Sequence, residues 1–302
     1  MQPLVSIDGV IVPAKDATIS VFDRGFLYGD SVFEVYRSYG SLRFLEAEHL
    51  ARLARSAEIV GIALPIELEV LTSEIETLHR ASGLGDAYLR VILSRGEGPL
   101  GIDPRSAYAP RRVLIAAPLE LPAASLYEEG AALITLSSAA PRSYTGAAGA
   151  KASNYLASIL AHQEARARGA HEALLIDGSG AILEGATSNF FIVRAGALYT
   201  PALESGILPG ITRALVLELA RDLGLGVHES TITLEELAEA DEAFITSSIR
   251  EIMPVRSVDG AAIGIQQARI RGRSTGPTTD RLREAYRARI EGARDNNASS
   301  SI

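Results

Sequence analysis

Lys151 is one of only two lysines in a chain that otherwise carries its positive charge on arginine. The 302 residues include 29 basic ones, of which two are lysine (Lys15 and Lys151) and the remaining 27 are arginine. A guanidinium stays protonated and is a poor nucleophile, whereas an ε-amine can be deprotonated by burial and neighbours and can then attack a carbonyl. The small residues Ala147-Ala148-Gly149-Ala150 let a bulky ligand come close. Lys151 is therefore our candidate for imine formation; the alternative is an ordinary lysine in a small-residue loop.

Pro209-Gly210-Ile211-Thr212 has the composition of a turn that leads into a helix. The first amides of a helix point at a bound anion, the glycine allows close approach, and the threonine adds a hydroxyl. Ser247-Ser248, at the end of a predicted strand, offers two more hydroxyls. Together these groups are typical of a phosphate site, without the spacing of a nucleotide P-loop. Taken singly, each is better explained by helix capping or turn hydrogen bonds.

Glu184 ends a predicted strand beside Gly185. A carboxylate in that place is usually a solvated strand end, but it could also pair with a protonated pyridine nitrogen and keep the ring electron-withdrawing. An amine, an anion site and a lone carboxylate are the three anchors that pyridoxal phosphate (PLP) requires.

The elements that must position these groups predict an α/β (α+β) fold with two domains. We expect a small N-terminal α/β domain at 1–118, a linker at 119–129, a larger C-terminal domain at 130–295 and a disordered tail at 296–302. The first domain is predicted to hold a hairpin at 4–12, a loop at 23–30, a strand at 31–39, helices at 46–60 and 65–82, a strand at 87–94, a loop at 95–110 and a strand at 111–117.

The second domain is predicted to begin with a strand at 131–137 and a loop that leads to Lys151. The apolar spacing after Lys151, at Leu156, Ile159 and Leu160, fits a partly buried helix to about Arg168. Further on we expect a hairpin of 172–176 with 181–184, strands at 188–193 and 196–200, a helix from about 211, a short helix at 235–240, a strand at 242–246 and a terminal helix after 279.

Alternation along the predicted strands sorts side chains onto two faces. Phe33, Val35 and Arg37 share one face of strand 31–39, and Val32, Glu34 and Tyr36 share the other. Arg37 is thus either at a strand end, with its charge reaching water, or facing a polar cavity. Strand 87–94 places Tyr88, Arg90 and Ile92 on one side. Arg52 lies off the apolar stripe of helix 46–60, so on its own it is interpreted as a solvated charge.

Composition argues against several classes of function. The net charge of −8 and the pI near 5.3 disfavour a nucleic-acid partner. No apolar run reaches the length of a membrane span, and no signal peptide is visible. The chain has no cysteine, and its five histidines lack metal-ligand spacing, so we expect no metal site. A cytoplasmic protein is the expectation.

Six motifs in this order resemble the fold-type IV, class IV PLP-dependent aminotransferases, over about residues 4–290. This family includes the branched-chain and D-amino-acid aminotransferases and aminodeoxychorismate lyase. The motifs are Tyr28-Gly29-Asp30-Ser31-Val32-Phe33-Glu34, His49-Leu50-Ala51-Arg52-Leu53, Lys151-Ala152-Ser153-Asn154-Tyr155, Leu183-Glu184-Gly185 with Ser188-Asn189-Phe190, Leu208-Pro209-Gly210-Ile211-Thr212-Arg213, and Thr246-Ser247-Ser248 with Glu251 and Pro254-Val255.

The resemblance implies roles residue by residue. Lys151 would bind the cofactor covalently, Glu184 would bind the pyridine nitrogen, Tyr155 the ring 3-oxygen, and Leu208 would pack on the ring. The phosphate would be held by Arg52, Ile211, Thr212 and Ser248, and Gly210 and Ser247 are also expected to contact the cofactor. The fold would be a small and a large domain, with the second built on a pseudo-barrel sheet and the active site between them, at the interface of a homodimer. The activity would pass an amino group from an amino acid to a 2-oxo acid such as 2-oxoglutarate by a ping-pong mechanism.

The substrate is less well specified, because the chain mixes features of several branches. Lys151-x-x-Asn154 and Ser247-Ser248-Ile249 depart from branched-chain enzymes, whereas Tyr155, Tyr88 and Arg90 match them. The Arg-x-His clamp of bacterial D-enzymes falls at Leu100-Gly101-Ile102 and is missing. We expect a branched-chain or aliphatic amino donor. The alternatives are a D-amino-acid or (R)-amine transaminase, aminodeoxychorismate lyase, and a PLP-binding protein without turnover. The residues expected at the substrate are Phe33, Val35, Arg37, Tyr88, Arg90, Arg95, Ile249 and Arg250, with the arginines unranked as carboxylate ligands.

Overall fold

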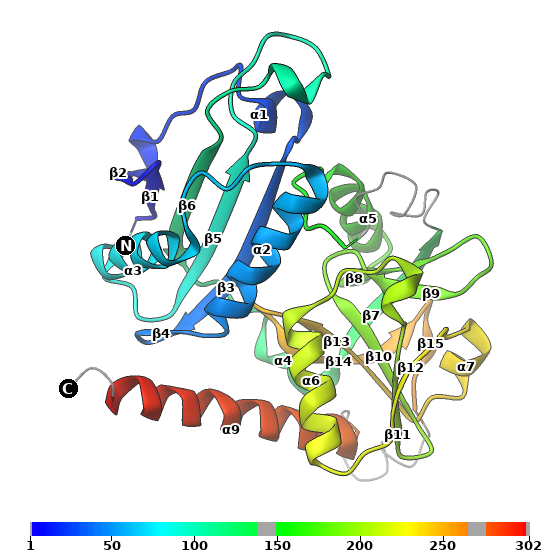
Figure 1. Cartoon of the computed structure of the whole chain (residues 1–302). Coiled ribbons are helices and arrows are strands. Elements are labelled where there is room, and N and C mark those ends of the chain that lie inside the picture. Colours follow the sequence, from blue (N-terminus) through cyan, green and yellow to red (C-terminus); the bar gives the residue numbers. More distant parts are fainter. Residues whose placement is uncertain (1, 138–148, 265–275, 300–302) are drawn as a thin grey trace. The chain divides into compact units, whose positions relative to one another are not determined.

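The computed structural model describes residues 2–137, 149–264 and 276–299 (Figure 1). These residues form two compact units. Unit 1 contains 1–120, 150–155 and 290–302, and unit 2 contains 121–149 and 156–289. Lys151 and Tyr155 therefore group with the N-terminal strands and helices, although they lie far along the chain. The predicted mixture of helices and sheets is confirmed.

Unit 1 is built on a six-stranded sheet in the order β2-β1-β6-β5-β3-β4, in which all neighbouring strands are antiparallel. The strands are β1 (Leu4–Ile7), β2 (Val10–Pro13), β3 (Ser31–Tyr39), β4 (Leu42–Arg43), β5 (Ala87–Ser94) and β6 (Arg111–Pro118). The hairpin of β1 and β2 turns at Asp8 and Gly9, as predicted.

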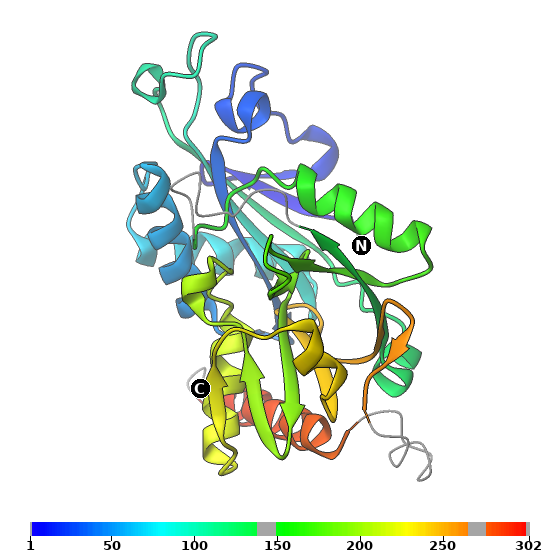
Figure 2. The ribbon, with the colours of Figure 1, turned by 90° about the vertical axis from the view of Figure 1, so that its right-hand side faces the viewer.

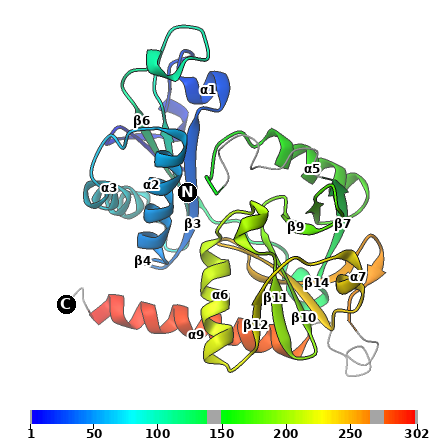
Figure 3. The same cartoon turned by 45° about the vertical axis from the view of Figure 1, so that its right-hand side comes forward.

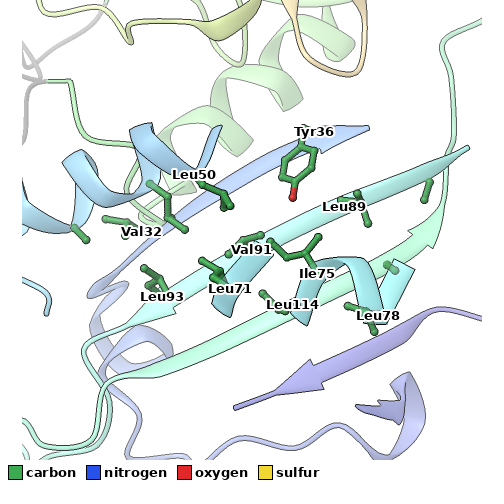
Figure 4. Packing of buried hydrophobic residues seen from close by; sticks show 14 of the residues in the cluster. Val32, Tyr36, Leu50, Leu71, Ile75, Leu78, Leu89, Val91, Leu93 and Leu114 are labelled. Atoms are coloured by element: carbon green, nitrogen blue, oxygen red, sulfur yellow. The ribbon is translucent and has the colours of Figure 1, made fainter. Parts of the chain in front are cut away.

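Two amphipathic helices cover one face of this sheet, α2 (Glu46–Val60) on β3 and α3 (Leu68–Ser82) on β6 and β1. Figure 4 shows the core between these helices and the sheet, where Leu50, Leu71 and Ile75 of the helices share one cluster with Val32 and Tyr36 of β3. Burying these apolar side chains is the main force that holds the helices on the sheet. Because side chains alternate along a strand, Phe33, Arg37 and Arg90 lie on the opposite face, away from this core.

Unit 2 is built on a nine-stranded mixed sheet in the order β12-β11-β10-β13-β14-β7-β8-β9, with β15 paired to β14. Its strands are β7 (Ala131–Ser137), β8 (Glu172–Ile176), β9 (Ile182–Gly185), β10 (Asn189–Arg194), β11 (Ala197–Thr200), β12 (Val227–Glu229), β13 (Glu242–Ser247), β14 (Glu251–Val258) and β15 (Ala261–Ala262). The pairs β14–β7, β7–β8 and β11–β12 are parallel, and the others are antiparallel.

The helices of unit 2 pack against this sheet. The helix α5 (Leu156–Ala167) lies on β7 and β8 (Figure 2), and α6 (Ile211–Asp222) lies on β12 and β13 (Figure 3). Shorter helices are α4 (Ala124–Glu129), which packs on β14, and α7 (Leu234–Ala238), which begins with a capping box formed by Thr233 and Glu236. The last helix is α9 (Pro277–Ser299).

Several local expectations differ from the structure. The loop expected at 23–30 contains a short helix, α1 (Arg24–Tyr28), capped by the Asp23 side chain. Short 3-10 helices occur at Ala14–Asp16, Pro104–Ser106 and Leu203–Ser205. Residues 124–129 of the expected linker form α4, and α9 runs to Ser299, into the stretch expected to be disordered. Residues 300–302 and the segment 138–148 of the loop before Lys151 lie outside the described residues.

The partly buried helix predicted after Lys151 is present as α5, but its buried face does not carry the apolar residues whose spacing predicted it. Leu156, Ile159 and Leu160 are 66%, 58% and 56% exposed, whereas Ala161 and Ala165 are buried. The small alanine face of α5 is the one that packs on β7 and β8, because small residues let the helix approach a sheet closely. The larger apolar residues therefore remain on its surface.

Candidate functional site

The segment that carries Lys151 is held against unit 1 by backbone hydrogen bonds. Phe33 N donates to the Lys151 carbonyl (2.9 Å), and Ser153 N donates to the Ser31 carbonyl (2.9 Å). On the other side, Lys151 N donates to Oγ of Ser56 on α2 (3.1 Å). The lysine is thus fixed at the start of β3, although 111 residues lie between the end of β3 and Lys151 along the chain.

The Lys151 amine lies beside two aromatic rings. Its Nζ donates to Tyr155 Oη (3.2 Å) and lies 4.7 Å from the centroid of the Phe33 ring. Tyr155 meets Phe33 edge-on, with ring centroids 5.0 Å apart. The Arg90 guanidinium also stacks on Phe33, with Cζ 4.1 Å from the ring centroid. An amine, a phenol and a guanidinium therefore gather around one phenylalanine; we call these four residues the lysine cluster.

Arg52 is buried and ion-paired, so the interpretation of a solvated charge is wrong. Its guanidinium binds Glu34 in a bidentate way, with Nε to Oε1 at 2.6 Å and Nη2 to Oε2 at 2.7 Å. Nδ1 of His49 lies 2.7 Å from the same carboxylate. All three residues are at most 3% exposed.

The charges of this buried triad are set by competing effects. Burial alone raises the pKa of Glu34, but the hydrogen bonds and charge of Arg52, together with His49, outweigh it and lower that pKa to about 2. Burial lowers the pKa of His49, against the opposing effect of Glu34. Glu34 and His49 were not among the predicted site residues. The signal that could have found Glu34 is its place between Val32 and Tyr36 on the face that packs against α2.

The structure separates the four arginines that sequence reasoning left unranked. Arg95 donates to Asp30 (2.8 Å) and to the carbonyls of Val60 and Gly61 at the end of α2. Nη2 of Arg37 lies 3.5 Å from the Asp86 carboxylate. Arg90 is half-buried and forms no ion pair or side-chain hydrogen bond with any residue that the structure describes. Its face of β5 also carries Tyr88, whose cross-strand partner on β3 is Arg37, while Val35 is directly opposite Arg90.

Arg250, in unit 2, is committed to a buried carboxylate. It donates to Glu172, to the carbonyl (3.1 Å) and hydroxyl of Thr187, and through Nε to Ser247 Oγ (3.2 Å). Burial raises the pKa of Glu172, but Arg250 outweighs that effect and the pKa lies below its ordinary value. Ser247 thus braces the turn of Ser248 and Ile249 between β13 and β14.

Glu184 is buried at the end of β9, where two nitrogen donors hold one of its oxygens. Its Oε2 accepts from Leu208 N (3.1 Å) and from Asn189 Nδ2 (3.3 Å), and Asn189 Nδ2 also donates to the Leu208 carbonyl (2.9 Å). Glu184 is 5% exposed. The solvated strand end, which is the usual interpretation of such a carboxylate, is therefore wrong.

Just after Leu208, the chain forms the N-terminus of α6. Gly210 is the N-cap, so no side chain caps the first turn, and Ile211 and Thr212 are its first helical residues. Thr212 is therefore inside the helix and does not cap it. The unpaired amides of a first turn and the helix dipole favour an anion at this end.

These groups fit PLP by their chemistry. Unit 1 offers an amine beside a phenol, and unit 2 offers a buried carboxylate that is hydrogen-bonded to the chain just before a helix N-terminus. Within the described ranges, no three acidic or histidine side chains are grouped so that they could hold a metal ion. None of the helices described is both long and apolar enough to pass through a bilayer.

Residues 31–258 match the family model described as amino-transferase class IV. The branched-chain-amino-acid aminotransferase of Escherichia coli (strain K12) is 36% identical over 286 residues, which cover 92% of this chain and 90% of that protein. Among solved structures, the branched-chain aminotransferase of the thermophilic archaeon Thermoproteus uzoniensis, with norvaline, is 36% identical with a TM-score of 0.86, covering 96% of this chain and 95% of that one.

A structure of the T.th. branched-chain amino acid aminotransferase contains pyridoxamine 5'-phosphate. It is 34% identical, has a TM-score of 0.86, and covers 97% of this chain and 95% of that one. Class IV aminotransferases use PLP, a cofactor that requires an amine, a carboxylate and an anion site from the protein. With a family match over three-quarters of its length and relatives that span nearly all of it, the chain belongs to the class IV aminotransferases.

Proposed function

We propose that this transaminase moves the amino group of branched-chain or other aliphatic amino acids to 2-oxoglutarate or a similar 2-oxo acid. The observation that carries this proposal is the lysine cluster, in which the Lys151 amine and the Arg90 guanidinium lie on the same Phe33 ring. An amine that can form an imine and a cation that can bind a carboxylate are the two groups that an amino-acid substrate needs. The branched-chain donors of the similar enzymes support the aliphatic preference.

In this proposal the predicted residues share one PLP. Lys151 binds the aldehyde, Tyr155 the ring oxygen, Glu184 the ring nitrogen, and Leu208 packs on the ring. The phosphate is held by Arg52, Ile211, Thr212 and Ser248, and Gly210 and Ser247 also contact the cofactor. The support for Glu184 is its burial, since a carboxyl group kept from water can pair closely with a ring nitrogen. Arg52 fits an anion ligand less simply, because Glu34 already shares its charge.

The cofactor supplies an aldehyde and a ring that withdraws electrons from the substrate carbon. The chain's own work is proton transfer and orientation. Lys151 would hold the cofactor through its amine. When it is not bonded to the cofactor, its Nζ would serve as the base that takes the proton from the substrate Cα and as the acid that gives it back. Tyr155 Oη, which accepts a hydrogen bond from Nζ, orients the amine for this transfer.

Arg90 is the ligand that we assign to a substrate carboxylate. Arg95 and Arg250 each bind several partners, and Arg37 lies beside Asp86. Arg90, by contrast, makes no side-chain hydrogen bond or ion pair to a described residue, so its N–H donors can bind a substrate. Arg90→Gln should raise KM for 2-oxoglutarate by about 10- to 100-fold, the value of a charge-assisted hydrogen bond, and leave PLP binding unchanged. Arg55→Gln, a change to an exposed arginine on α2, is the matched control. Equal KM values for 2-oxoglutarate in the two variants would show that Arg90 does not bind the substrate carboxylate.

Borohydride reduction tests the cofactor link directly. Reduction of the holoenzyme, digestion and mass analysis should place the pyridoxyl mass on Lys151. A label on Lys15, or on no lysine, would overturn the proposal.

Half-reactions separate the donors and the rival activities. The visible absorbance of the bound cofactor should fall when L-leucine or L-valine is added without an acceptor. A far faster reaction with D-alanine, D-glutamate or simple amines would make the chain a D-amino-acid or (R)-amine transaminase. Release of 4-aminobenzoate from aminodeoxychorismate would identify the lyase, and no response to a broad donor panel would leave a PLP-binding protein without turnover.

We also propose that the enzyme is a cytoplasmic homodimer. Unit 1 presents large apolar side chains to solvent, among them Phe26 (65% exposed), Leu100 (73%) and Ile102 (87%). Arg24 Nη1 donates to the Gly101 carbonyl (2.8 Å), and Gly101 N donates to Tyr28 Oη (3.0 Å), so these residues are held in place. Ordered exposed apolar groups favour a protein partner. Light scattering should give twice the chain mass, and Ile102→Asp should shift it toward the monomer.

A further inference from the structure

We infer that Asn189 is a positioning residue that ties the carboxylate for the cofactor ring to the segment for its phosphate. This inference rests on the proposed roles of Glu184 and of residues 208–212. Asn189 opens β10, and its backbone pairs with Thr246 of β13. The strand pairing therefore fixes the backbone position of residue 189, and a substitution of the side chain should leave that position unchanged.

The Asn189 amide is shared between two of these groups. Its Nδ2 donates to Glu184 Oε2 (3.3 Å) and to the carbonyl of Leu208 (2.9 Å), while Leu208 N donates to the same Glu184 oxygen (3.1 Å). The carboxylate and the backbone of Leu208 thus form a small closed ring of hydrogen bonds through Asn189. A carboxylate held by two donors keeps one orientation, which a ring nitrogen requires of its partner.

The other end of the same amide reaches the start of α6. A Cβ added at Gly210 would overlap Asn189 Oδ1, and it would come within 3.2 Å of Arg213 Cβ. Gly210 has φ −68° and ψ 135°, values that alanine adopts readily. The need for glycine here is therefore spatial: Asn189 fills the volume that a side chain at 210 would take. Any larger residue at 210 must displace either Asn189 or the first turn of α6.

Asn189 therefore links three of the parts that the cofactor would contact in unit 2, namely the carboxylate, the Leu208 backbone and the helix N-terminus. Its burial, 5% exposed, removes water as a substitute for its amide. Loss of the side chain leaves the Leu208 carbonyl without that donor and lets the Glu184 carboxylate rotate. Because hydrogen bonds to a charged group are worth about 1.5–3 kcal/mol, removing Asn189 should weaken PLP binding by about 10- to 100-fold.

The test measures PLP affinity for the full-length apoenzyme by calorimetry, so it does not depend on turnover. We expect the loss just given for Asn189→Ala, and weaker binding for Gly210→Ala. In the Asn189→Ala background the overlap is gone, so Gly210→Ala should cause little further loss. Thr200→Val is the matched control, since Thr200 Oγ1 donates to the carbonyl of Phe190 (2.8 Å) and is fully buried in the same sheet. Its PLP affinity should equal that of the wild type.

The outcomes distinguish this inference from the proposed function. Absence of PLP binding and of a pyridoxyl label on Lys151 in the wild type defeats the proposed function. Normal labelling with an unchanged affinity in Asn189→Ala, or a Gly210→Ala penalty that is the same in both backgrounds, overturns the role of Asn189. If Asn189→Ala does not fold, Asn189→Asp keeps the side-chain volume and puts a second carboxylate beside Glu184. It should then bind PLP more weakly as pH rises, and a pH-independent, wild-type affinity would overturn the inference.

Discussion

Replacement of Glu34 by glutamine should lower the free energy of unfolding of the apoenzyme far more than the same replacement in an equally well-formed but more exposed ion pair of unit 1. Glu34 and Arg52 have side-chain exposures of 0% and 4%, and two short hydrogen bonds join them. A pKa held at about 2, against the ordinary 4.5, corresponds to about 3 kcal/mol of stabilisation. Breaking a buried pair by removing one partner costs about 3–5 kcal/mol, because the other charge stays buried. We therefore expect Glu34→Gln to lose about 3 kcal/mol at pH 7.

Glu74→Gln is the matched control for this experiment. Glu74 also binds an arginine in a bidentate way, with both of its oxygens 2.7 Å from Arg112. Those side chains are 19% and 14% exposed, so water can replace part of the interaction. The expected loss is therefore smaller, about 1 kcal/mol. Urea unfolding of both variants, followed by circular dichroism without cofactor, gives the comparison.

The pH dependence gives a second test of the same pair. Because the pKa of Glu34 is lowered in the folded protein, its stabilisation is complete above pH 4.5 and is lost as pH falls toward about 2. The difference in the free energy of unfolding between the wild type and Glu34→Gln should become smaller as pH falls through that interval. A loss of stability in Glu34→Gln no larger than in Glu74→Gln at pH 7, or a difference that is the same at every pH, would contradict this role of the pair.

Three further predictions concern single contacts. Gly96 has φ +90°, and a Cβ there would overlap the Ala109 carbonyl, so Gly96→Ala should lower Tm and cost about 2 kcal/mol or more, while Gly178→Ala, whose Cβ meets nothing within 4 Å, should not. Glu242 caps the start of α9 through three hydrogen bonds, so Glu242→Gln should speed amide exchange in its first turns; unchanged exchange would argue against the cap. Arg250→Met leaves Glu172 buried without its cation and should cost about 3 kcal/mol, with part of the loss recovered in thermal melts at acidic pH, where Glu172 can take a proton.

Periodicity predicted most of the regular elements correctly, because their burial follows from local sequence. The helix at Glu46–Val60 and the strands at Ser31–Tyr39 and Ala87–Ser94 begin and end where predicted. The strand β14, Glu251–Val258, was not predicted. It contains Pro254 and Arg256 and begins at Glu251, which has φ 57°, so its local signal for a strand is weak. Backbone hydrogen bonds to β13 on one side and β7 on the other stabilise it as a strand despite this weak local signal.

Burial of charge was the feature that local reasoning judged least well. Arg52 lies off the apolar stripe of α2 and looks solvated in sequence, yet a carboxylate on β3 meets it inside the protein. The exposed apolar residues of α5 show the opposite error, since their spacing alone implied burial. Periodicity counts apolar positions, but it does not say which neighbouring element is present to cover them.

The sequence by itself determined that this chain carries one amine in a small-residue setting, and it supplied the motifs by which the family is known. Those properties belong to residue types and their order. Only the tertiary structure decided the partners of the arginines: Asp30 meets Arg95 across 65 residues, and Glu172 meets Arg250 across 78. Ion pairs form between groups that folding brings within a few ångströms, and the number of residues between two groups along the chain does not predict that distance. That is why Arg90 could be distinguished from the other three arginines only after the chain was folded.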